Sequence, residues 1–274
     1  MGLLQAFVLG IVQGLTEFLP ISSSGHLVLV PFLFGWDEPT LAFVVAAHIG
    51  TLIAVIVVFW DEVKLVVQTV LKWKHALEVE RAVVRFLAIG TVPAVVVGVV
   101  FELIYRDKIE MTFERPVLAS FLLGVTAWWL MSTEANVAHR EVPGRIARDM
   151  LPADAGWIGV AQAVAILPGI SRSGATIAAG MRLGFARDAA ARFSFLLAIP
   201  AILGATILSL PDIVDQGLSG SGPAFVIGLV TSAGSGFIAI RWFLRLVARR
   251  DMKPFGTYLV LMMVAGLLTA LARG

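Results

Sequence analysis

The sequence predicts an all-α polytopic membrane protein, built from six transmembrane helices and two re-entrant helix pairs. Of its 274 residues, 58% are hydrophobic and 15% are charged, and the mean hydropathy is +0.90. Soluble domains carry about 25% charged residues, and several apolar stretches here approach the ~20 residues that cross a bilayer. Two further apolar stretches are interrupted by a proline and a run of serines. Such a break is tolerated at membrane depth only where protein or water covers the backbone.

Charge and cysteine content exclude several other classes of protein. The net charge is only +2 and the basic residues fall in the expected loops, so we expect no nucleic-acid partner. There are no cysteines, which excludes disulfide bonds and thiolate chemistry. We expect a single domain within the bilayer, and a homodimer is one of the assemblies that the sequence leaves open.

The first half of the chain, about residues 1–132, is predicted to hold one re-entrant pair and three spans. Its first two apolar segments, 2–19 and 22–34, are each too short to cross and are separated by Pro20 and three serines. The elements that follow are expected to be a span over 40–60, an amphipathic segment over 61–84, a span over 85–104 bent near Pro93, a polar loop over about 105–115 and a span over 116–132.

A polar loop over 133–156 is the predicted boundary between two repeats. The second repeat, 157–274, is expected to begin with another broken pair, over 157–167 and 171–184. The later elements are expected to be spans over 188–210, 223–244 and 255–272, a flexible loop over 211–222 and a basic turn over 245–253.

The distribution of basic residues predicts the orientation. Six spans and two re-entrant pairs put the loops 61–84, 133–156, 182–192 and 245–253 on one side, with 14 Lys and Arg residues, against four on the other side. The positive-inside rule then places the richer side in the cytoplasm and both termini outside the plasma membrane. The first pair would enter from outside and the second from the cytoplasm. This is an inverted-topology repeat, whose sites lie near the midplane.

The two broken segments repeat one pattern at a constant offset of 149 residues. QGLTEFLPISSSGH runs from Gln13 to His26, and QAVAILPGISRSGA runs from Gln162 to Ala175. Five positions are identical: Gln13/Gln162, Ile21/Ile170, Ser22/Ser171, Ser24/Ser173 and Gly25/Gly174. The first copy contributes Glu17 and His26, and the second contributes Arg172. We therefore predict that the two halves meet and form one phosphate site.

Both breaks have the features of an anion site. Serines at a helix start cap backbone N–H groups, and those N–H groups with the helix dipole attract anions. For any single serine, capping and close helix packing alone stay an alternative. Arg172 sharpens the prediction, because a guanidinium in an apolar segment is costly and its planar fork suits phosphate oxygens. The alternative for Arg172 is a structural pair with Glu17. The candidate phosphate-binding residues are Gln13, Ser22, Ser24, Gly25, Ser171, Ser173, Gly174 and Thr176.

The first copy also offers groups for proton transfer. Glu17 could act as a general base, orient a histidine or hold a divalent cation. Gln13 lies one turn earlier on the same face and can ligate, but it adds no charge. His26 can donate or accept a proton near neutral pH. One of the serines could attack phosphorus with His26 or Glu17 as its base, and a water activated by Glu17 or a metal is the competing scheme.

Other polar residues are weaker candidates. His48 lies inside the span 40–60, where a hydrogen-bonded core histidine is the simpler interpretation, and we leave it unassigned. The residues predicted to be solvated, in loops or at span ends, are His75, Glu102, Glu134 and His139.

At these residues the chain resembles the undecaprenyl-diphosphate phosphatase family, also called the bacitracin-resistance proteins. The motifs that carry the resemblance are QGLTEFLPISSSGH and PGISRSGAT, the latter from Pro168 to Thr176, and their order and separation also match. The resemblance implies removal of the terminal phosphate from a C55 polyprenyl diphosphate, which regenerates the lipid carrier for cell-wall peptidoglycan precursors. It also implies a divalent cation such as Mg²⁺ or Ca²⁺, an inverted-repeat membrane fold and a site that faces the outer side.

The resemblance also implies roles for individual residues. The family's motifs fall on Gln13 and Glu17, on Ser22, Ser23 and His26, and on Ser171, Arg172, Ser173 and Thr176. Ser23 stands at the family's usual candidate nucleophile. The family allows Glu or Gln at the first acidic position, so Gln13 leaves Glu17 as the single carboxylate here. We expect Arg172 to bind the diphosphate, Ser23 to attack or position, Glu17 to act as base or metal ligand, and His26 to move the proton.

The rival prediction is a transporter or flippase of polyprenyl phosphate. Inverted repeats with broken helices at the midplane are the architecture of secondary transporters. A flippase would use the same anion site without a nucleophile, so release of inorganic phosphate separates the two functions.

Overall fold

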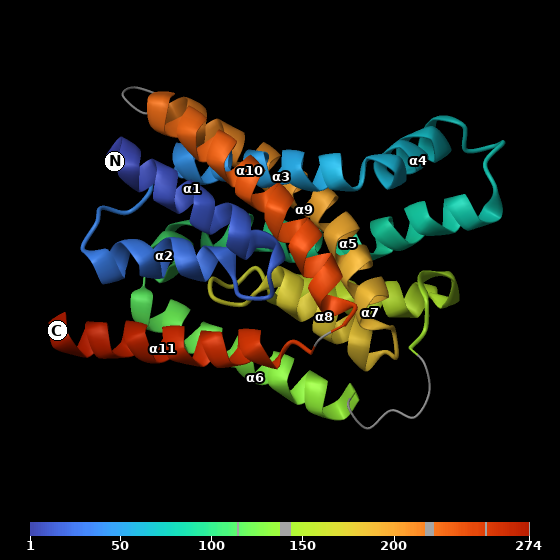
Figure 1. The fold of residues 1–274 in the computed structure, drawn as a ribbon. Coiled ribbons are helices and arrows are strands. Elements are labelled where there is room, and N and C mark those ends of the chain that lie inside the picture. Colours follow the sequence, from blue (N-terminus) through green and yellow to red (C-terminus); the bar gives the residue numbers. More distant parts are fainter. Residues whose placement is uncertain (114, 138–143, 217–221, 250, 274) are drawn as a thin grey trace.

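The computed structural model is built of helices (Figure 1). It describes residues 1–113, 115–137, 144–216, 222–249 and 251–273. For residues 102, 104–113, 212 and 214–216 it describes the backbone alone. The helices in these ranges are α1 (Leu3–Phe18), α2 (Ser23–Phe34), α3 (Leu41–Val58), α4 (Trp60–Leu71), α5 (Glu78–Phe113), α6 (Pro116–Val137), η1 (Ala147–Asp149), α7 (Pro152–Val164), α8 (Arg172–Arg182), α9 (Arg187–Gln216), α10 (Gly222–Val247) and α11 (Lys253–Arg273).

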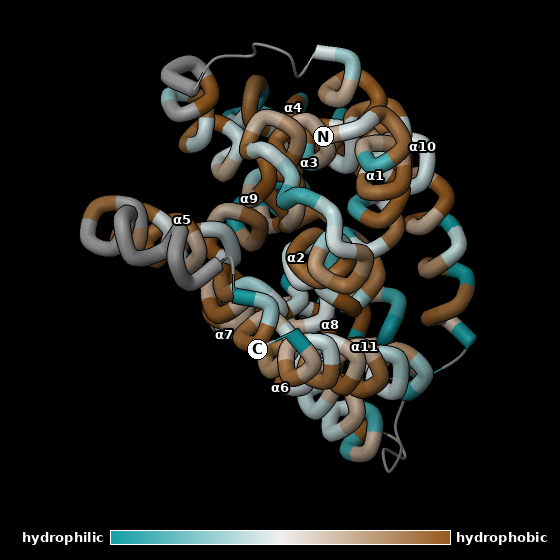
Figure 2. Tube along the Cα trace, turned by 90° about the vertical axis from the view of Figure 1, so that its left-hand side faces the viewer, coloured by the Kyte–Doolittle hydropathy of each residue, from teal (hydrophilic) through white to brown (hydrophobic). Residues whose placement is uncertain are grey.

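Six of the described helices are long and apolar enough to cross a membrane, which confirms the six predicted spans. They cover Leu41–Val58, Glu78–Phe101, Pro116–Val137, Arg187–Pro211, Gly222–Val247 and Lys253–Arg273. Many of their large apolar side chains are exposed, as bilayer-facing residues are; Leu261 is 65% and Ile238 64% exposed. Most of the helical trace is apolar when the molecule is viewed from the end where both termini lie (Figure 2). The chain is a multi-pass membrane protein.

Several predicted boundaries were wrong, because a helix does not end where its hydropathy falls. Helix α5 runs on to Phe113 through most of the predicted loop 105–115, and α9 runs on to Gln216 into the predicted loop 211–222. The segment 61–84 is two helices, α4 and the start of α5, rather than one. The polar loop 133–156 is helical at both ends. Pro152 at the first helical position and Asp154, which accepts from Leu151 N at 2.9 Å, begin α7 earlier than predicted.

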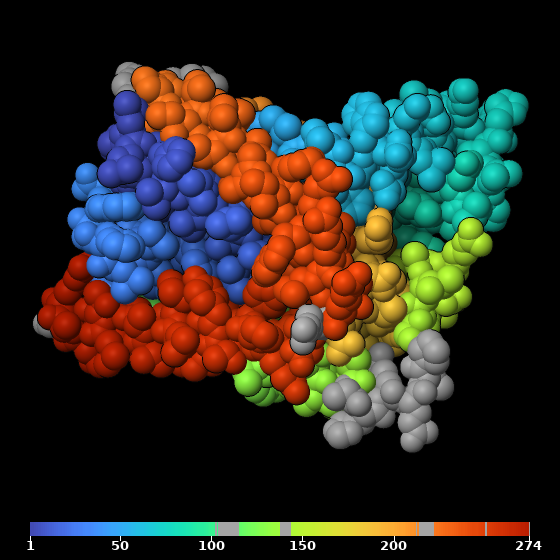
Figure 3. All heavy atoms as spheres, viewed as in Figure 1, coloured from blue at the N-terminus to red at the C-terminus, as the bar shows by residue number. Residues whose placement is uncertain are grey.

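The two broken segments form two helical hairpins at opposite ends of the molecule. Helices α1 and α2 occupy the end where the termini lie, and α7 and α8 occupy the other end (Figure 1). Figure 3 shows the first hairpin at the surface between α10 and α11. The breaks between the paired helices, at residues 19–22 and 165–171, lie in the middle of the molecule.

Small residues and one aromatic cluster fix the helices around these breaks. A Cβ added at Gly14 of α1 would lie 2.0 Å from Ser235 Oγ of α10, so α1 and α10 are in backbone-close contact. Phe195 of α9 is the centre of the aromatic cluster. Its ring lies 5.4 Å from Phe18, 6.2 Å from Phe59 and 5.8 Å from Phe243. These contacts place the end of α1 against α9, beside the second break.

Candidate active site

The two breaks touch each other. Ser173 Oγ donates to the Leu19 carbonyl at 2.9 Å, and Gly169 N donates to Ser24 Oγ at 3.4 Å. A Cβ added at Gly25 would lie only 3.1 Å from Gly169 Cα, so the two breaks approach each other closely at Gly25. Residues about 150 positions apart in the chain therefore lie in contact, as the repeated motif predicted.

The two serine segments cap their helices in the same way. Ser22 Oγ accepts from Gly25 N at 3.2 Å, and Ser171 Oγ accepts from Gly174 N at 3.0 Å. Each capping hydroxyl also contacts the serine two residues later, Ser24 at 3.3 Å and Ser173 at 3.1 Å. The helix starts at Ser23 and Arg172 thus have the caps that the sequence predicted, and both helix N-termini lie at the junction.

Ser22 has a strained backbone. Its φ is +69° and its ψ 97°, and it is the only non-glycine residue with positive φ among those described. Such conformations cost about 1–3 kcal/mol and persist where the surroundings hold them. The Ser22 carbonyl is held by two donors of His26, the backbone N at 3.2 Å and the ring Nδ1 at 2.7 Å.

The Glu17 carboxylate is the centre of the polar cluster. One oxygen accepts from Arg172 Nη2 at 3.1 Å. The other accepts from Ser23 Oγ at 2.6 Å and from Gln13 Nε2 at 2.9 Å. Glu17 is 7% exposed and Gln13 is fully buried. The structural pair of Arg172 with Glu17, which the sequence left as an alternative, is therefore present, and it stands beside the candidate nucleophile.

Two N–H groups of Arg172 are used within the described residues, and the others are available to a ligand. Its Nη1 donates to the Ser194 carbonyl of α9 at 3.3 Å, and its Nη2 donates to Glu17. A guanidinium has five N–H donors. The Arg172 side chain is 14% exposed. Its contacts with Glu17 and Ser194 hold the guanidinium in one orientation, and the exposed part can be reached by an anion.

His48 lies closer to the site than the sequence indicated. Its Nδ1 lies 2.8 Å from the Val44 carbonyl, which can only accept, so Nδ1 carries a proton. Its Nε2 then faces Glu17 Oε2 at 3.8 Å. The side chain is 28% exposed, so it is not an enclosed core histidine. It joins the cluster as a neighbour of the Glu17 carboxylate.

His26 has both ring nitrogens engaged away from Glu17. Nδ1 contacts the Ser22 carbonyl, and Nε2 lies 2.7 Å from Tyr258 Oη of α11. The residue is 2% exposed. Its predicted role in moving the proton of Ser23 stays a prediction, since the partner of the Ser23 hydroxyl is Glu17.

Three residues of the site were missed by sequence reasoning. Thr126 of α6 accepts from Ser171 N at 3.1 Å and donates to the Gly169 carbonyl at 3.0 Å, which holds the second break. Ser194 of α9 contacts Thr176 Oγ1 at 2.6 Å. Tyr258 contacts His26. Each lies in a predominantly apolar span outside the repeated motif, where the only available signal is its polarity.

The prediction that Glu134 is solvated was wrong. It is 1% exposed, pairs with Arg187 through both carboxylate oxygens and accepts from Met252 N at 2.9 Å. His75 is exposed, as predicted. The side chains of Glu102 and His139 lie outside the described residues.

The donors around Glu17 suit a hard cation only in part. Within the described residues no three His, Asp or Glu side chains form a metal cluster. Gln13 Oε1 is buried beside Glu17 and has no hydrogen-bond partner among the described atoms. One carboxylate and one unpaired amide oxygen match the ligands of Mg²⁺, which commonly binds one or two carboxylates, several waters and substrate phosphates.

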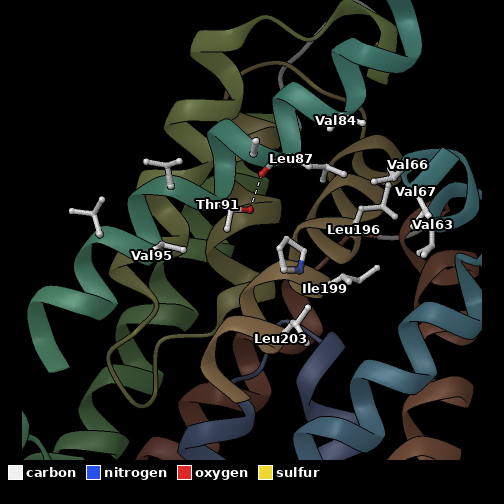
Figure 4. Close-up of a pocket in the computed structure, with 14 residues that line it drawn as sticks. Val63, Val66, Val67, Val84, Leu87, Thr91, Val95, Leu196, Ile199 and Leu203 are labelled. Carbon is white, nitrogen blue, oxygen red and sulfur yellow. Dashed lines mark hydrogen bonds between the residues drawn. The ribbon is translucent and has the colours of Figure 1, made fainter. Parts of the chain in front are cut away.

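The structure also has an apolar cavity of about 500 Å³, whose lining residues are drawn in Figure 4 and include none of the polar site residues described above. On α9 it is lined by Leu196, Ile199, Pro200 and Leu203, and its other walls are α4 and α5. Ser194 of α9 touches the polar cluster, and residues two apart on a helix point in nearly opposite directions. Helix α9 therefore separates this cavity from the site.

The sequence matches the family described as "Bacitracin resistance protein BacA" over residues 6–265. The chain belongs to this family. Curated relatives extend the match over the full length. An "Undecaprenyl-diphosphatase" of Pelotomaculum thermopropionicum is 41% identical, over 100% of this chain and 98% of the relative. One of Desulforudis audaxviator is 43% identical, over 98% of both chains. The "Undecaprenyl-diphosphatase 2" of Stutzerimonas stutzeri is 42% identical, over 94% of both. As a member of the BacA family, the chain carries Glu17, Ser23 and Arg172 within the matched region.

Proposed function

We propose that this chain hydrolyses undecaprenyl diphosphate to undecaprenyl phosphate and inorganic phosphate, and so recycles the lipid carrier of cell-wall synthesis. The full-length relatives that bear the name undecaprenyl-diphosphatase support this activity. The observation that carries the mechanism is the hydrogen bond from Ser23 Oγ to Glu17 Oε2, beside Arg172 and two helix N-termini. Phosphoryl transfer uses a nucleophile, an adjacent base and a positively charged group held in place, and Ser23, Glu17 and Arg172 can fill these roles.

In this proposal Ser23 Oγ attacks the terminal phosphorus, and its proton passes to Glu17. The bond from that phosphorus to the bridging oxygen breaks, and undecaprenyl phosphate leaves with the electron pair. Water then attacks the phosphoserine, inorganic phosphate leaves, and Ser23 regains a proton. In the competing scheme Glu17 is a metal ligand or activates a water for the attack, and is not the base for Ser23.

Arg172 links substrate binding to the basicity of Glu17. A carboxylate that is paired with a guanidinium is a weak base, because the cation stabilises its charged form. When the diphosphate draws the guanidinium fork toward its own oxygens, Glu17 loses that stabilisation and becomes the better proton acceptor. The N-termini of α2 and α8, with Ser22, Ser24, Gly25, Ser171, Ser173, Gly174 and Thr176, would hold the remaining phosphate oxygens.

A divalent cation, Mg²⁺ or Ca²⁺, is part of the proposal. In the scheme in which Glu17 is a metal ligand rather than the base, Glu17 and the unpaired Gln13 Oε1 would hold the cation together with phosphate oxygens. When bound, it would neutralise charge on the diphosphate. The single carboxylate supports a cation that binds with the substrate rather than before it.

We also propose that the chain is one domain made of two inverted repeats, 1–132 and 157–274. The excess of basic residues on the side of 61–84 and 245–253, and the hairpins at opposite ends of the molecule, support this topology. Both termini and the site's entrance would then face outward. A homodimer stays a prediction.

The test is phosphate release by the purified protein in detergent. With undecaprenyl diphosphate we expect release that EDTA stops and that Mg²⁺ or Ca²⁺ restores. Absence of release with every divalent cation, together with movement of polyprenyl phosphate across liposomes, would instead favour the flippase.

A further inference from the structure

We infer that Tyr258 is a positioning residue, which holds His26 against the Ser22 carbonyl and so keeps Ser23 directed at Glu17. This inference rests on the proposed function for its kinetic consequences. Its geometric part is a chain of contacts from α11 to the serine segment, and it gives His26 a task other than proton transfer.

The first step is the conformation of Ser22. Its positive φ is one that L-residues with a side chain rarely adopt, so neighbouring groups must hold it. Its carbonyl accepts from the His26 backbone N at 3.2 Å and from His26 Nδ1 at 2.7 Å. Ser23 is the next residue, so a rotation of the Ser22 peptide would carry the Ser23 hydroxyl away from Glu17, which it contacts at 2.6 Å.

The second step is the tautomer of His26. A carbonyl oxygen only accepts, so Nδ1 carries a hydrogen and donates to Ser22. In the neutral ring Nε2 then has a lone pair. Tyr258 Oη lies 2.7 Å from Nε2 and is the group that can donate to it. The tyrosine hydroxyl thus favours the one tautomer in which His26 can hold Ser22.

The third step is the placement of Tyr258 itself. Helix α11 is in close contact with α6, since a Cβ at Gly256 would lie 2.5 Å from Met131 Cγ and one at Gly266 would lie 2.1 Å from Ser120 Oγ. Tyr258 therefore lies on a helix whose position is fixed by its close packing against α6. The planes of the His26 and Tyr258 rings are nearly parallel, with an interplanar angle of 9°.

Three variants separate positioning from proton transfer. Tyr258→Phe removes only the hydroxyl, and we expect kcat to fall about 10- to 100-fold with KM within about twofold of wild type. His26→Asn keeps a donor where Nδ1 lies but cannot move a proton at neutral pH. We expect it to keep more activity than His26→Leu by a factor of about 10 or more.

The double variant tests whether Tyr258 acts through His26. In the His26→Asn background, Tyr258→Phe should have no further effect, because the acceptor Nε2 is gone. Thr257→Val is the matched control: it removes a neighbouring α11 hydroxyl, which donates to the Lys253 carbonyl, and should leave turnover unchanged. Full activity of Tyr258→Phe, or equal inactivity of His26→Asn and His26→Leu, would overturn the inference.

A spectroscopic readout keeps this inference separate from the proposed function. With ¹⁵N-labelled histidine, and the His26 signals assigned from the His26→Asn spectrum, wild type should show the Nδ1–H tautomer with Nε2 as acceptor. The Nε2 signal should shift in Tyr258→Phe. A wild-type Nε2–H tautomer would overturn the inference even if phosphate is released, and the expected tautomer would support it even if no phosphate is released.

Discussion

The Ser23 hydroxyl donates to Glu17 Oε2 at 2.6 Å while Arg172 Nη2 donates to Glu17 Oε1 at 3.1 Å. One buried carboxylate therefore connects a hydroxyl from the first broken segment to a guanidinium from the second. Neither half of the chain has this arrangement alone. The contact between the two breaks, through Ser173 and Leu19, is what brings the three groups together.

Replacing Glu17 with Gln should remove most of the activity. The amide has nearly the same size but cannot accept the Ser23 proton, and general bases contribute about 10²- to 10⁴-fold to rate. We expect kcat to fall by that factor in a phosphate-release assay. Glu62→Gln is the matched control, since Glu62 forms a partly exposed ion pair with Arg192. A Glu17→Gln variant with more than a third of wild-type turnover would contradict the assignment.

Replacing His48 with Phe should lower kcat about fivefold, which corresponds to loss of about 1 kcal/mol of stabilisation. The ring keeps its bulk, but the nitrogen that faces Glu17 at 3.8 Å is gone. His75→Phe, on the surface, should leave kcat unchanged. Equal turnover of His48→Phe and wild type would remove His48 from the site.

The sequence predicted the parts of this site that repeat. Two matching breaks and an arginine in an apolar segment are local signals, and they predicted the caps at Ser22 and Ser171. His48 and Tyr258 could not be assigned in this way, because each lies outside the repeated motif and its role depends on which helix packs opposite. Glu134 was misjudged for the same reason: a polar stretch surrounds it in sequence, while Arg187 and Met252 enclose it in the fold.

The Glu134–Arg187 pair should matter for stability rather than chemistry. Glu134→Ala leaves the partly exposed Arg187 guanidinium and the buried Met252 N–H without their partner, and leaving such groups unpaired costs about 1–3 kcal/mol. We expect a clearly lower thermal midpoint in detergent, with KM of the surviving folded protein unchanged. An unchanged midpoint would mean that the pair contributes nothing to folding.

Acid should weaken the start of α7. Burial alone would raise the pKa of Asp154, but hydrogen bonds from Arg145 and from Leu151 N outweigh it and hold that pKa below its ordinary value. A lowered carboxyl pKa contributes stability above the ordinary value near 4, and this is lost as the pH falls toward the folded pKa. Thermal midpoints of wild type and Asp154→Asn should differ most at pH 7 and converge below pH about 4. A difference between the two thermal midpoints that grows as the pH falls would contradict this role of Asp154.

The most direct test of the central claim is phosphate release by Ser23→Ala and Ser24→Ala, measured side by side with wild type. Ser24 is the neighbouring hydroxyl that contacts Ser22 and Gly169 rather than Glu17. The account predicts that Ser23→Ala loses at least about 10³-fold in kcat while folded, and that Ser24→Ala loses far less. Near wild-type turnover by Ser23→Ala would show that the Ser23 hydroxyl, and with it the Ser23–Glu17 contact, is not the centre of the chemistry.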